Sequence, residues 1–571
     1  MTATARRPQT RWLLPGQPAP EIVAALVADL NLPEVLCRLL AVRGFTAGEV
    51  AKRYLRPRLE HLSDPSLVAD LDRAVERIIR AIRADEMILI HGDYDVDGIS
   101  STTILTRTIR SVGGRVTPFI PHRLRDGYDL TSAGVEAAKA AGAKLVITCD
   151  CGTSAVGPVA DLASAGIDTI ISDHHLPGGP LPAAYAVLNP RKPGCTSLDK
   201  DLCAAGVAFK IAVALTRAMG ASPNIALNML DLVALATVAD VAPLRGENRV
   251  LVRYGLKLLN KTSSVGLASL IRAAGLQSKA ITAGRVGFIL GPRLNAAGRV
   301  GSAMRGVELM LAGDESVANP IARELEELNA KRQELDRQTL EEAREMVRIL
   351  DLEQTYGIVL AGDGWHPGVV GIVASRIVEE FGRPAVLIAL EGNEGKGSGR
   401  SISAFDLHAG IGRCRDLLLR FGGHRSAAGV TIARENVREF ARRFNAVARA
   451  TLKPEDLVPE LRADLEVQLA DVNDHLESML RHLEPCGIGN PSPVLVARGV
   501  RVAAAPKTVG KDGLRVRLQQ AGVEISALGW GMSHRASELA AGATVDVAFR
   551  LERDEWNGES RLQARLADIR T

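Results

Sequence analysis

The sequence lacks long apolar runs, paired cysteines and a strong charge of one sign. No stretch of about 18 uninterrupted apolar residues occurs, which argues against a membrane-spanning helix. The seven cysteines are scattered, and the close pair Cys149 and Cys151 lacks the CxxC spacing of a zinc ribbon. We therefore expect reduced thiols in a cytoplasmic protein. The apolar run within Met1–Gly16 is too short for a signal peptide, so none is expected.

The composition is that of an ordinary globular protein. Hydrophobic residues make up 46% and charged residues 24% of the 571 residues, and the net charge is only +4. At roughly 150 residues per domain, this length predicts three or four domains. A dispersed positive excess of this size permits a nucleic-acid partner but does not by itself indicate one.

Short apolar segments alternate with helical patterns in the first half of the chain. Met87–Ile90, Lys144–Thr148 and Thr169–Ile171 have the length and composition of buried strands. Each runs into a polar loop, and helical patterns at 99–111 and up to Ala165 follow the first two. This alternation predicts an α/β fold with a parallel sheet, which binds its ligands beyond the carboxyl ends of the strands.

We expect five parts along the chain. Ile321, Leu325 and Leu328 repeat at helical spacing among charged residues, which predicts a solvated connector helix, with a coiled coil as the alternative. After Lys453 the segments become short and alternating, which predicts a small β-barrel. The parts are an N-terminal helical segment (1–60), a parallel-sheet α/β domain (61–313), the connector helix (314–350), a smaller α/β domain (351–452) and the barrel (453–571).

The densest chemical signal is the segment His91–Gly98, with the sequence HGDYDVDG. Its carboxylates Asp93, Asp95 and Asp97 crowd negative charge into one turn, which is unfavourable unless cations neutralise it. A calcium EF-hand loop is excluded, because its twelfth position requires a glutamate and is Ile104 here. Mixed imidazole and carboxylate ligands suit Mn²⁺ and related ions. Further candidates lie at strand ends or in loops: Asp150, Asp173, His174, His175 and Asp240.

These motifs together resemble the DHH phosphoesterase superfamily. In chain order they are His91-x3-Asp95-x-Asp97, Asp150 in TCDCG, the triplet Asp173-His174-His175, and Asp240 in ATVADVAPL. The resemblance implies two divalent cations, Mn²⁺ or Mg²⁺. It assigns the first to His91, Asp95 and Asp150, and the second to Asp97, Asp150, His174 and Asp240. It also implies that His175 faces the substrate phosphate, with Asp93 and Asp173 as residues that orient the ligands. Asp231, also acidic and near Asp240, is expected to start a helix, because its surroundings lack the family pattern.

The second half of the chain resembles the DHHA1 domain and the RecJ exonucleases of that superfamily. Gly422, Gly423 and His424 form the GGH motif, in which glycines let the backbone approach a phosphate. RecJ-like stretches are GPRLNAAGR at 291–299, GSGRS at 397–401 and EPCGIGNPSP at 484–493, the last of which opens an OB-like barrel. The resemblance implies nucleic-acid or phosphate contacts from Arg293, Asn295 and Arg299, and a 5′-phosphate pocket from Arg123, Ser398 and Arg400.

The activity that the resemblance implies is two-metal hydrolysis of single-stranded DNA, 5′ to 3′, to mononucleotides in DNA repair and recombination. Two cations would activate a water and clamp both oxygens of an in-line displacement, so no protein nucleophile is needed. Aromatic residues make up only 4% of the chain, so salt-dependent contacts to phosphate are expected to dominate over base stacking. The aromatic candidates are Tyr94, Tyr128, Trp365 and Phe405, each expected to pack in a core rather than stack on a base.

Two alternatives remain open at this point. An oligoribonuclease or phosphatase of the same superfamily would keep the centre, but such relatives typically lack the barrel. A non-catalytic scaffold that binds single-stranded DNA would keep the fold, although every ligand position holds the expected residue type. The expected partners are single-stranded DNA, a single-stranded DNA-binding protein and a RecQ-type helicase, with no membrane. A monomer is expected because no long apolar heptad repeat is evident.

Overall fold

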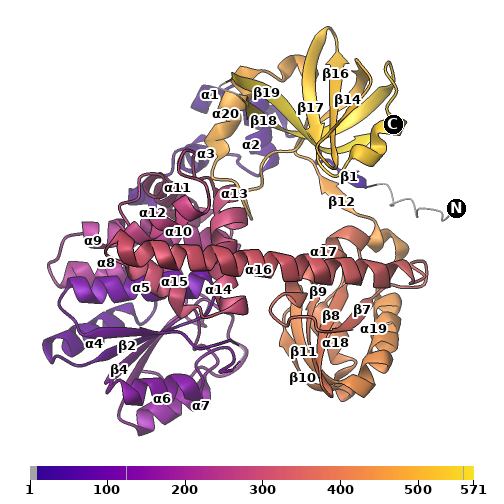
Figure 1. The fold of residues 1–571 in the computed structure, drawn as a ribbon. Coiled ribbons are helices and arrows are strands. Elements are labelled where there is room, and N and C mark those ends of the chain that lie inside the picture. Colours follow the sequence, from indigo (N-terminus) through magenta and orange to yellow (C-terminus); the bar gives the residue numbers. More distant parts are fainter. Residues whose placement is uncertain (1–9, 124, 557–558) are drawn as a thin grey trace. The chain divides into compact units, whose positions relative to one another are not determined.

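The computed structural model describes residues 10–123, 125–556 and 559–571 (Figure 1). These residues form two compact units. The large unit consists of Leu13–Glu326 and Arg462–Thr571, and the small unit consists of Glu327–Leu461 and a segment that ends at Trp12. No helix among the described residues combines the length and the apolar composition that crossing a membrane requires.

The large unit contains the predicted parallel sheet. Its strands lie in the order β3-β2-β4-β5-β6, and every neighbouring pair is parallel. Their bounds are β2 Ile88–Gly92, β3 Val116–Phe119, β4 Leu145–Cys149, β5 Asp168–Ser172 and β6 Ala186–Leu188. All five residues of both β2 and β4 are buried, as expected for central strands covered on both faces. The prediction of a parallel α/β sheet is confirmed.

Helices cover both faces of this sheet (Figure 1). One face carries α5 (Val96–Ser111) and α8 (Ala204–Ala218), and the other carries α6 (Ser132–Ala140) and α7 (Val156–Ser164). Further helices extend the α5 side: α4 Leu71–Arg83, α10 Leu230–Ala239, α11 Gly246–Leu259, α12 Val265–Ala273, α14 Gly291–Val300 and α15 Met304–Leu311. The sheet edge where the strands end therefore lies between two helical layers, which is where the sequence places its acidic residues.

The first helices of the chain share one hydrophobic core with the C-terminal barrel. Helices α1 (Pro20–Leu30), α2 (Glu34–Val42) and α3 (Gly48–Leu55) contribute buried residues such as Leu26 and Leu40 to the cluster that contains Val547 of the barrel. Helices α1, α2 and α3 thus pack as part of the barrel's core, a long-range contact that no local sequence pattern predicts.

The barrel is a partly closed ring. Its strand order is β13-β14-β18-β19-β17-β16-β15, and an additional pairing joins β14 to β16. The bounds are β13 Leu465–Glu466, β14 Leu495–Val502, β15 Lys507–Val509, β16 Gly513–Gln520, β17 Val523–Gly529, β18 Thr544–Trp556 and β19 Glu559–Arg570. The predicted OB-like β-barrel is confirmed.

The small unit holds a second, mixed α/β sheet in the order β10-β11-β9-β8-β7. Only β7 and β8 are parallel, and the other pairs are antiparallel. The bounds are β7 Ile358–Asp363, β8 Ala385–Glu391, β9 Glu394–Arg400, β10 Leu418–Gly423 and β11 Ala427–Ala433, with α17 at Val370–Phe381 and α19 at Val437–Thr451. The predicted connector is one continuous helix, α16, at Glu315–Arg348.

The glycine-rich stretches of the small unit are strands, which their composition did not predict. β9 carries Gly395, Gly397 and Gly399 in the middle of the sheet, between β8 and β11. A Cβ atom on Gly397 would lie 2.6 Å from Val430 Cγ2 and 2.9 Å from Ile388 Cγ1. Side chains of the neighbouring strands cover these glycines, so the sheet forms despite the low strand propensity of glycine.

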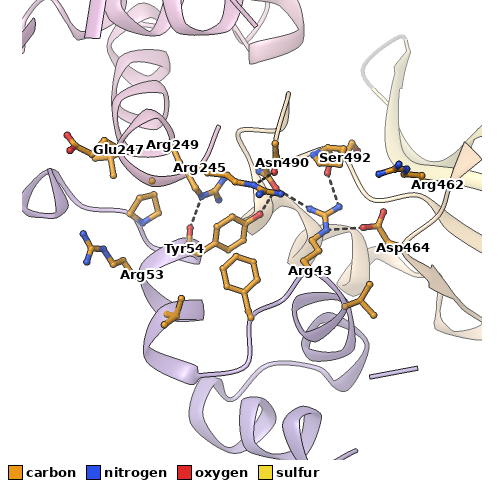
Figure 2. A pocket seen from close by; sticks show the side chains of 18 of the residues that line it. Arg43, Arg53, Tyr54, Arg245, Glu247, Arg249, Arg462, Asp464, Asn490 and Ser492 are labelled. Carbon is orange, nitrogen blue, oxygen red and sulfur yellow. Dashed lines mark hydrogen bonds and ion pairs between the residues drawn. The ribbon is translucent and has the colours of Figure 1, made fainter. Parts of the chain in front are cut away.

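Arg249 joins three parts of the large unit. Its side chain is buried, and its Nε donates to the Tyr54 carbonyl at 2.7 Å while its terminal nitrogens donate to the carbonyls of Leu483 and Glu484, both at 3.0 Å. The guanidinium also lies 4.1 Å from the centre of the Tyr54 ring. Tyr54 and Arg249 line a cavity of about 1150 Å³ between α3, α11 and the barrel (Figure 2).

Replacing Arg249 with methionine should destabilise the large unit by about 3 kcal/mol or more, because several buried carbonyls lose their donor. Arg253, one turn further along α11, donates to the Glu484 carbonyl at 3.2 Å and is the matched control. The Arg253→Met variant should lose less than about 1 kcal/mol. Urea unfolding followed by circular dichroism measures both, and equal losses would contradict the joining role of Arg249.

Candidate metal centre

Three strands of the parallel sheet end side by side. Gly92 at the end of β2 pairs with Cys149 of β4, and Cys149 pairs with Ser172 of β5. The next residue after each strand is therefore an aspartate at the same edge of the sheet: Asp93, Asp150 and Asp173. The three motifs that lie far apart in the sequence meet because parallel strands align their carboxyl ends.

The turn after β2 leads directly into α5. Asp95 is the N-cap of this helix, and its Oδ1 accepts the backbone N–H groups of Asp97 at 2.9 Å and Gly98 at 3.1 Å. A Cβ atom on Gly98 would lie 2.3 Å from the carbonyl oxygen of Asp93, so only glycine fits here. The cap and the glycine fold the acidic segment tightly enough to bring its carboxylates together.

Asp97 is held by the N-terminus of α8. Its Oδ2 and Oδ1 accept the backbone N–H groups of Ala204 and Ala205, both at 2.7 Å. The side chain is buried, and burial, followed by the charge of Asp95, raises the pKa of Asp97 to about 7. Helix N–H groups thus offset part of the charge on this carboxylate.

Asp150 occupies the centre of the cluster. Its backbone lies in the left-handed region with φ 67°, and its N–H donates to the carbonyl of Ser172 at 3.0 Å. His174 Nε2 lies 3.0 Å from Asp150 Oδ1, 3.7 Å from Asp97 Oδ2 and 3.8 Å from Asp240 Oδ2. Burial and the charges of Asp97 and Asp95 raise the pKa of Asp150 well above its usual value. One imidazole therefore faces three carboxylates from three different elements.

Asp173 anchors the adjoining His175. Its Oδ1 lies 2.8 Å from His175 Nδ1 and accepts the His174 N–H at 2.7 Å, and its Oδ2 accepts the Thr153 N–H at 3.0 Å. Burial alone would raise the pKa of Asp173, but the hydrogen bond from His175, the charges of both histidines and the hydrogen bond from Thr153 together lower it. Burial lowers the pKa of His175, but the hydrogen bond to Asp173 and the charges of Asp173, Asp240 and Asp97 together raise it to about 9. The side chain of His175 is 41% exposed, so its ring reaches solvent while Asp173 fixes it.

The remaining electrostatics indicate a site for cations. Burial raises the pKa of Asp93 well above its usual value and that of Asp240 to about 8, with neighbouring carboxylates as the next cause in each case. Burial lowers the pKa of His174 to about 3, so its ring is neutral and offers a lone pair. Oδ1 of Asp93 is buried and has no hydrogen-bond partner among the described residues. Carboxylates that repel one another beside a neutral imidazole fit Mn²⁺ or Mg²⁺.

Potential ligand atoms within 4.8 Å of one another form three overlapping groups in the described part of the chain. The groups are Asp93-Asp95-Asp150, Asp97-His174-Asp240 and Asp150-His174-His175. Asp150 belongs to two of them, in agreement with the shared role that the resemblance implies. The fold brings together the residues predicted to hold the second cation, because Asp97, Asp150 and Asp240 all lie around the imidazole of His174.

His91 does not join these groups among the described residues. Its ring is buried against α6, where a Cβ atom on Gly134 would lie 2.7 Å from His91 Nε2, and its Nδ1 lies 3.5 Å from Cys151 Sγ. Asp93, which is expected to orient ligands, has a carboxylate oxygen within 4.8 Å of those of Asp95 and Asp150. The assignment of His91 to the first metal remains a prediction.

The GPRLNAAGR stretch supports the acidic turn. Asn295 Oδ1 accepts the Val96 N–H at 3.1 Å, and a Cβ atom on Gly298 would lie 2.2 Å from the Tyr94 carbonyl oxygen. Arg293 forms an ion pair with Glu326, with Nη2 and Oε1 3.1 Å apart. Contacts of Arg293, Asn295 and Arg299 with a nucleic acid remain predictions. The bonds that Arg293 and Asn295 form within the protein are explained by a structural role.

Arg123 lies near the same turn, on an aromatic side chain. Its guanidinium is 4.7 Å from the centre of the Tyr94 ring. Tyr128, expected to pack in the core, is instead 47% exposed, and its hydroxyl lies 3.3 Å from His175 Nε2. Trp365 and Phe405 are buried, as expected.

The predicted phosphate-contacting residues of the small unit lie on adjacent strands. Gly422 on β10 pairs with Gly429 on β11, which pairs with Ser398 on β9. Arg400 NH1 donates to Ser398 Oγ at 3.1 Å, and the N–H of His424 donates to the Ala427 carbonyl at 2.8 Å. The GSGRS and GGH motifs, separate in the sequence, therefore lie together on one sheet.

Sequence reasoning missed two residues that support the centre. Asp129 Oδ1 accepts the Gly152 N–H at 2.6 Å and so holds the turn that follows Asp150. Asn189, buried just after β6, donates to the His175 carbonyl at 2.8 Å and to Thr153 Oγ1 at 2.9 Å. The position of Asn189 directly after a short apolar segment was a usable signal, but nothing local marks Asp129.

Asp231 lies at the start of a helix, as the sequence predicts. It lies in the first turn of α10, and its Oδ1 accepts the Leu232 N–H at 2.8 Å while its Oδ2 accepts the Thr262 hydroxyl at 3.0 Å. These bonds satisfy its carboxylate within the helical layer, so its helix-start role is confirmed.

Three families of domains match this chain. Residues 87–237 match the DHH family, N-terminal domain, residues 354–450 match the DHHA1 domain, and residues 463–568 match the RecJ OB domain. The first two ranges contain the parallel sheet and the mixed sheet, and the third covers the barrel except for the last two residues of β19.

Relatives and solved structures agree with these matches. The chain is 36% identical to the single-stranded-DNA-specific exonuclease RecJ of Bacillus subtilis over 98% of its length and 70% of the relative's. It is 34% identical to that of Escherichia coli over 95% of its length and 97% of the relative's. RecJ of Thermus thermophilus in complex with Mn²⁺ superposes with a TM-score of 0.85 at 33% identity, covering 98% of this chain and 80% of that one. The Mg²⁺ complex gives a TM-score of 0.79 at 31% identity, covering 98% and 78%. With its DHH, DHHA1 and OB domains, the chain belongs to the RecJ family.

Proposed function

We propose that this protein is a metal-dependent exonuclease that degrades single-stranded DNA from the 5′ end to mononucleotides, with a role in DNA repair and recombination. The observation that carries the proposal is the cluster of buried carboxylates around His174 and Asp150 in a chain of the RecJ family. The relatives are named single-stranded-DNA-specific exonucleases, and solved structures of RecJ from Thermus thermophilus contain Mn²⁺ or Mg²⁺. The OB domain supports the binding of single-stranded DNA.

Two groups of residues, which share Asp150, would each hold one cation at the centre. Asp93, Asp95 and Asp150 would hold one divalent cation, and Asp97, Asp150, His174 and Asp240 would hold the other. When bound, the cations would supply an activated water and offset the negative charge of the phosphate. His175, fixed by Asp173 and exposed to solvent, would contact the phosphate directly.

Further phosphate contacts are proposed on each unit. In the large unit they come from Arg123, Arg293, Asn295 and Arg299, and in the small unit from Ser398, Arg400, Gly422, Gly423 and His424. Binding of the 5′ phosphate by Arg123, Ser398 and Arg400 would give the polarity of degradation. The cationic and backbone donors among these residues recognise phosphate without reading bases, which agrees with digestion of any sequence.

The cellular setting is proposed from the family. A single-stranded DNA-binding protein and a RecQ-type helicase are the expected protein partners, the protein is expected to act in the cytoplasm, and a monomer is the expected state. The proposed domain boundaries are 1–60, 61–313, 314–350, 351–452 and 453–571.

A 5′-phosphorylated single-stranded DNA with a 3′ label tests the activity directly. With Mn²⁺, the wild-type protein should produce a descending ladder that retains the label, because nucleotides leave from the 5′ end. The Asp150→Ala variant should reduce the rate at least about 1000-fold, since the shared carboxylate is lost. Asp161→Ala, which removes an exposed carboxylate on α7, is the matched control and should retain the wild-type rate.

Survival of the long strand together with hydrolysis of pyrophosphate or dinucleotides would show a different substrate of the same centre. Binding of the DNA with no cleavage of any of these compounds would contradict the enzyme and favour a scaffold. Immediate release of the 3′ label as a mononucleotide would contradict the polarity.

The Asp93→Asn variant tests whether Asp93 is a metal ligand. Asp93→Asn should weaken Mn²⁺ binding by about tenfold or more, whereas His91→Gln should leave the affinity within about threefold of wild type. Without metal, Asp93→Asn should also raise the Tm, because it removes one of the charges that repel Asp95. Calorimetric titration with Mn²⁺ and thermal unfolding in EDTA give both values. Weaker binding by the His91 variant alone would support the ligand set implied by the family.

A further inference from the structure

The helix that supplies Asp240 ends in an unusual residue. Helix α10 closes with the N–H of Val241 donating to the Val238 carbonyl at 3.2 Å and that of Ala242 donating to the Thr237 carbonyl at 3.1 Å. This paired arrangement is a Schellman motif, whose left-handed position is usually glycine. Here that position is Val241, with φ 61°.

A β-branched residue in this conformation is strained. Among the described residues, the other non-glycine positions with positive φ are asparagine, aspartate or alanine: Asn31, Asp70, Asp85, Asp129, Asp150 and Ala521. Burial does not compensate for the strain, because Val241 is 58% exposed. Glycine would hold the same turn with less strain, so the fold itself gives no reason for the isopropyl group.

A residue of the metal centre immediately precedes this exposed side chain in the sequence. Val241 directly follows Asp240, and Leu176, 60% exposed, directly follows His175. Asp240 and the histidine pair are neighbours, with His174 Nε2 3.8 Å from Asp240 Oδ2. Two exposed aliphatic side chains thus adjoin the residues that would surround a bound phosphate.

We propose that Val241 contacts the bases of the nucleotides on either side of the phosphate to be cleaved, with Leu176 as a second apolar contact. The inference rests on the proposed function and adds the residues that hold the nucleoside part of the substrate. An aliphatic contact covers the face of any base and reads no hydrogen-bonding edge, which suits an enzyme that digests every sequence. It also suits a chain with few aromatic residues available for stacking.

The Val241→Gly variant separates this contact from stability. It should raise the Tm by about 1 to 3 °C because it relieves the strained φ, and it should leave Mn²⁺ binding unchanged. On 5′-phosphorylated single-stranded DNA its kcat/KM should fall about tenfold, mainly through KM. On the same DNA with its first two nucleotides abasic, the variant and the wild type should agree within about twofold, because the base is already missing. Leu176→Ala should show the same pattern without the rise in Tm.

Asn31→Gly is the control, since it changes a left-handed residue at the end of α1 outside the metal centre and should leave kcat/KM unchanged. A Val241→Gly variant with wild-type kcat/KM on intact DNA would overturn the inference while the exonuclease stands. An equal loss on intact and abasic DNA would also overturn it, since the contact would not be with a base. A wild-type protein that does not cut DNA would overturn the proposed function and this inference together.

Discussion

The crowding of buried carboxylates at one edge of a parallel sheet is the constraint on which the rest of the centre depends. Asp93, Asp97 and Asp150 are almost fully removed from solvent, and burial with mutual repulsion raises the pKa of each. Such an arrangement is unfavourable for a protein by itself, and divalent cations turn the repulsion into attraction. The same repulsion that lowers the stability of the metal-free protein therefore raises the affinity of the centre for divalent cations.

The surrounding elements keep these carboxylates in place against their repulsion. The N-terminus of α8 holds Asp97 with two backbone N–H groups, and Asp129 holds the turn after Asp150. Asp173 fixes His175, and Asn189 fixes the backbone of the same histidine. Regular elements and buried hydrogen bonds thus preorganise the ligands before any metal or DNA arrives.

The sequence predicts much of this centre because strand ends carry their own signals. Apolar segments that run into acidic residues located the sheet edge, and the motif residues Asp150, His174 and Asp240 meet as expected. For the first metal site, the assignment of His91 stays a prediction, because the geometry groups Asp93 rather than His91 with Asp95 and Asp150. His91, still within β2, turns toward α6, whereas Asp93 lies beyond the strand and reaches the cluster.

Features set by distant contacts were outside what local patterns could predict. The glycines of β9 fit a central strand only because Val430 and Ile388 cover them. The first helices pack into the core of a barrel more than 400 residues later in the chain, which neither segment indicates alone. Domains inferred from composition shifts along the chain do not show which segments share a core.

The number of Mn²⁺ ions bound per chain tests the central claim most directly. Equilibrium dialysis against Mn²⁺, with metal and protein quantified in the same sample, should give two ions per chain for the wild type. The Asp150→Asn variant, which removes the shared charge, should lose both sites at the same free Mn²⁺ concentration. A wild type that binds no ion or one ion, or a variant that still binds two, would contradict the account of a carboxylate cluster built around a pair of cations.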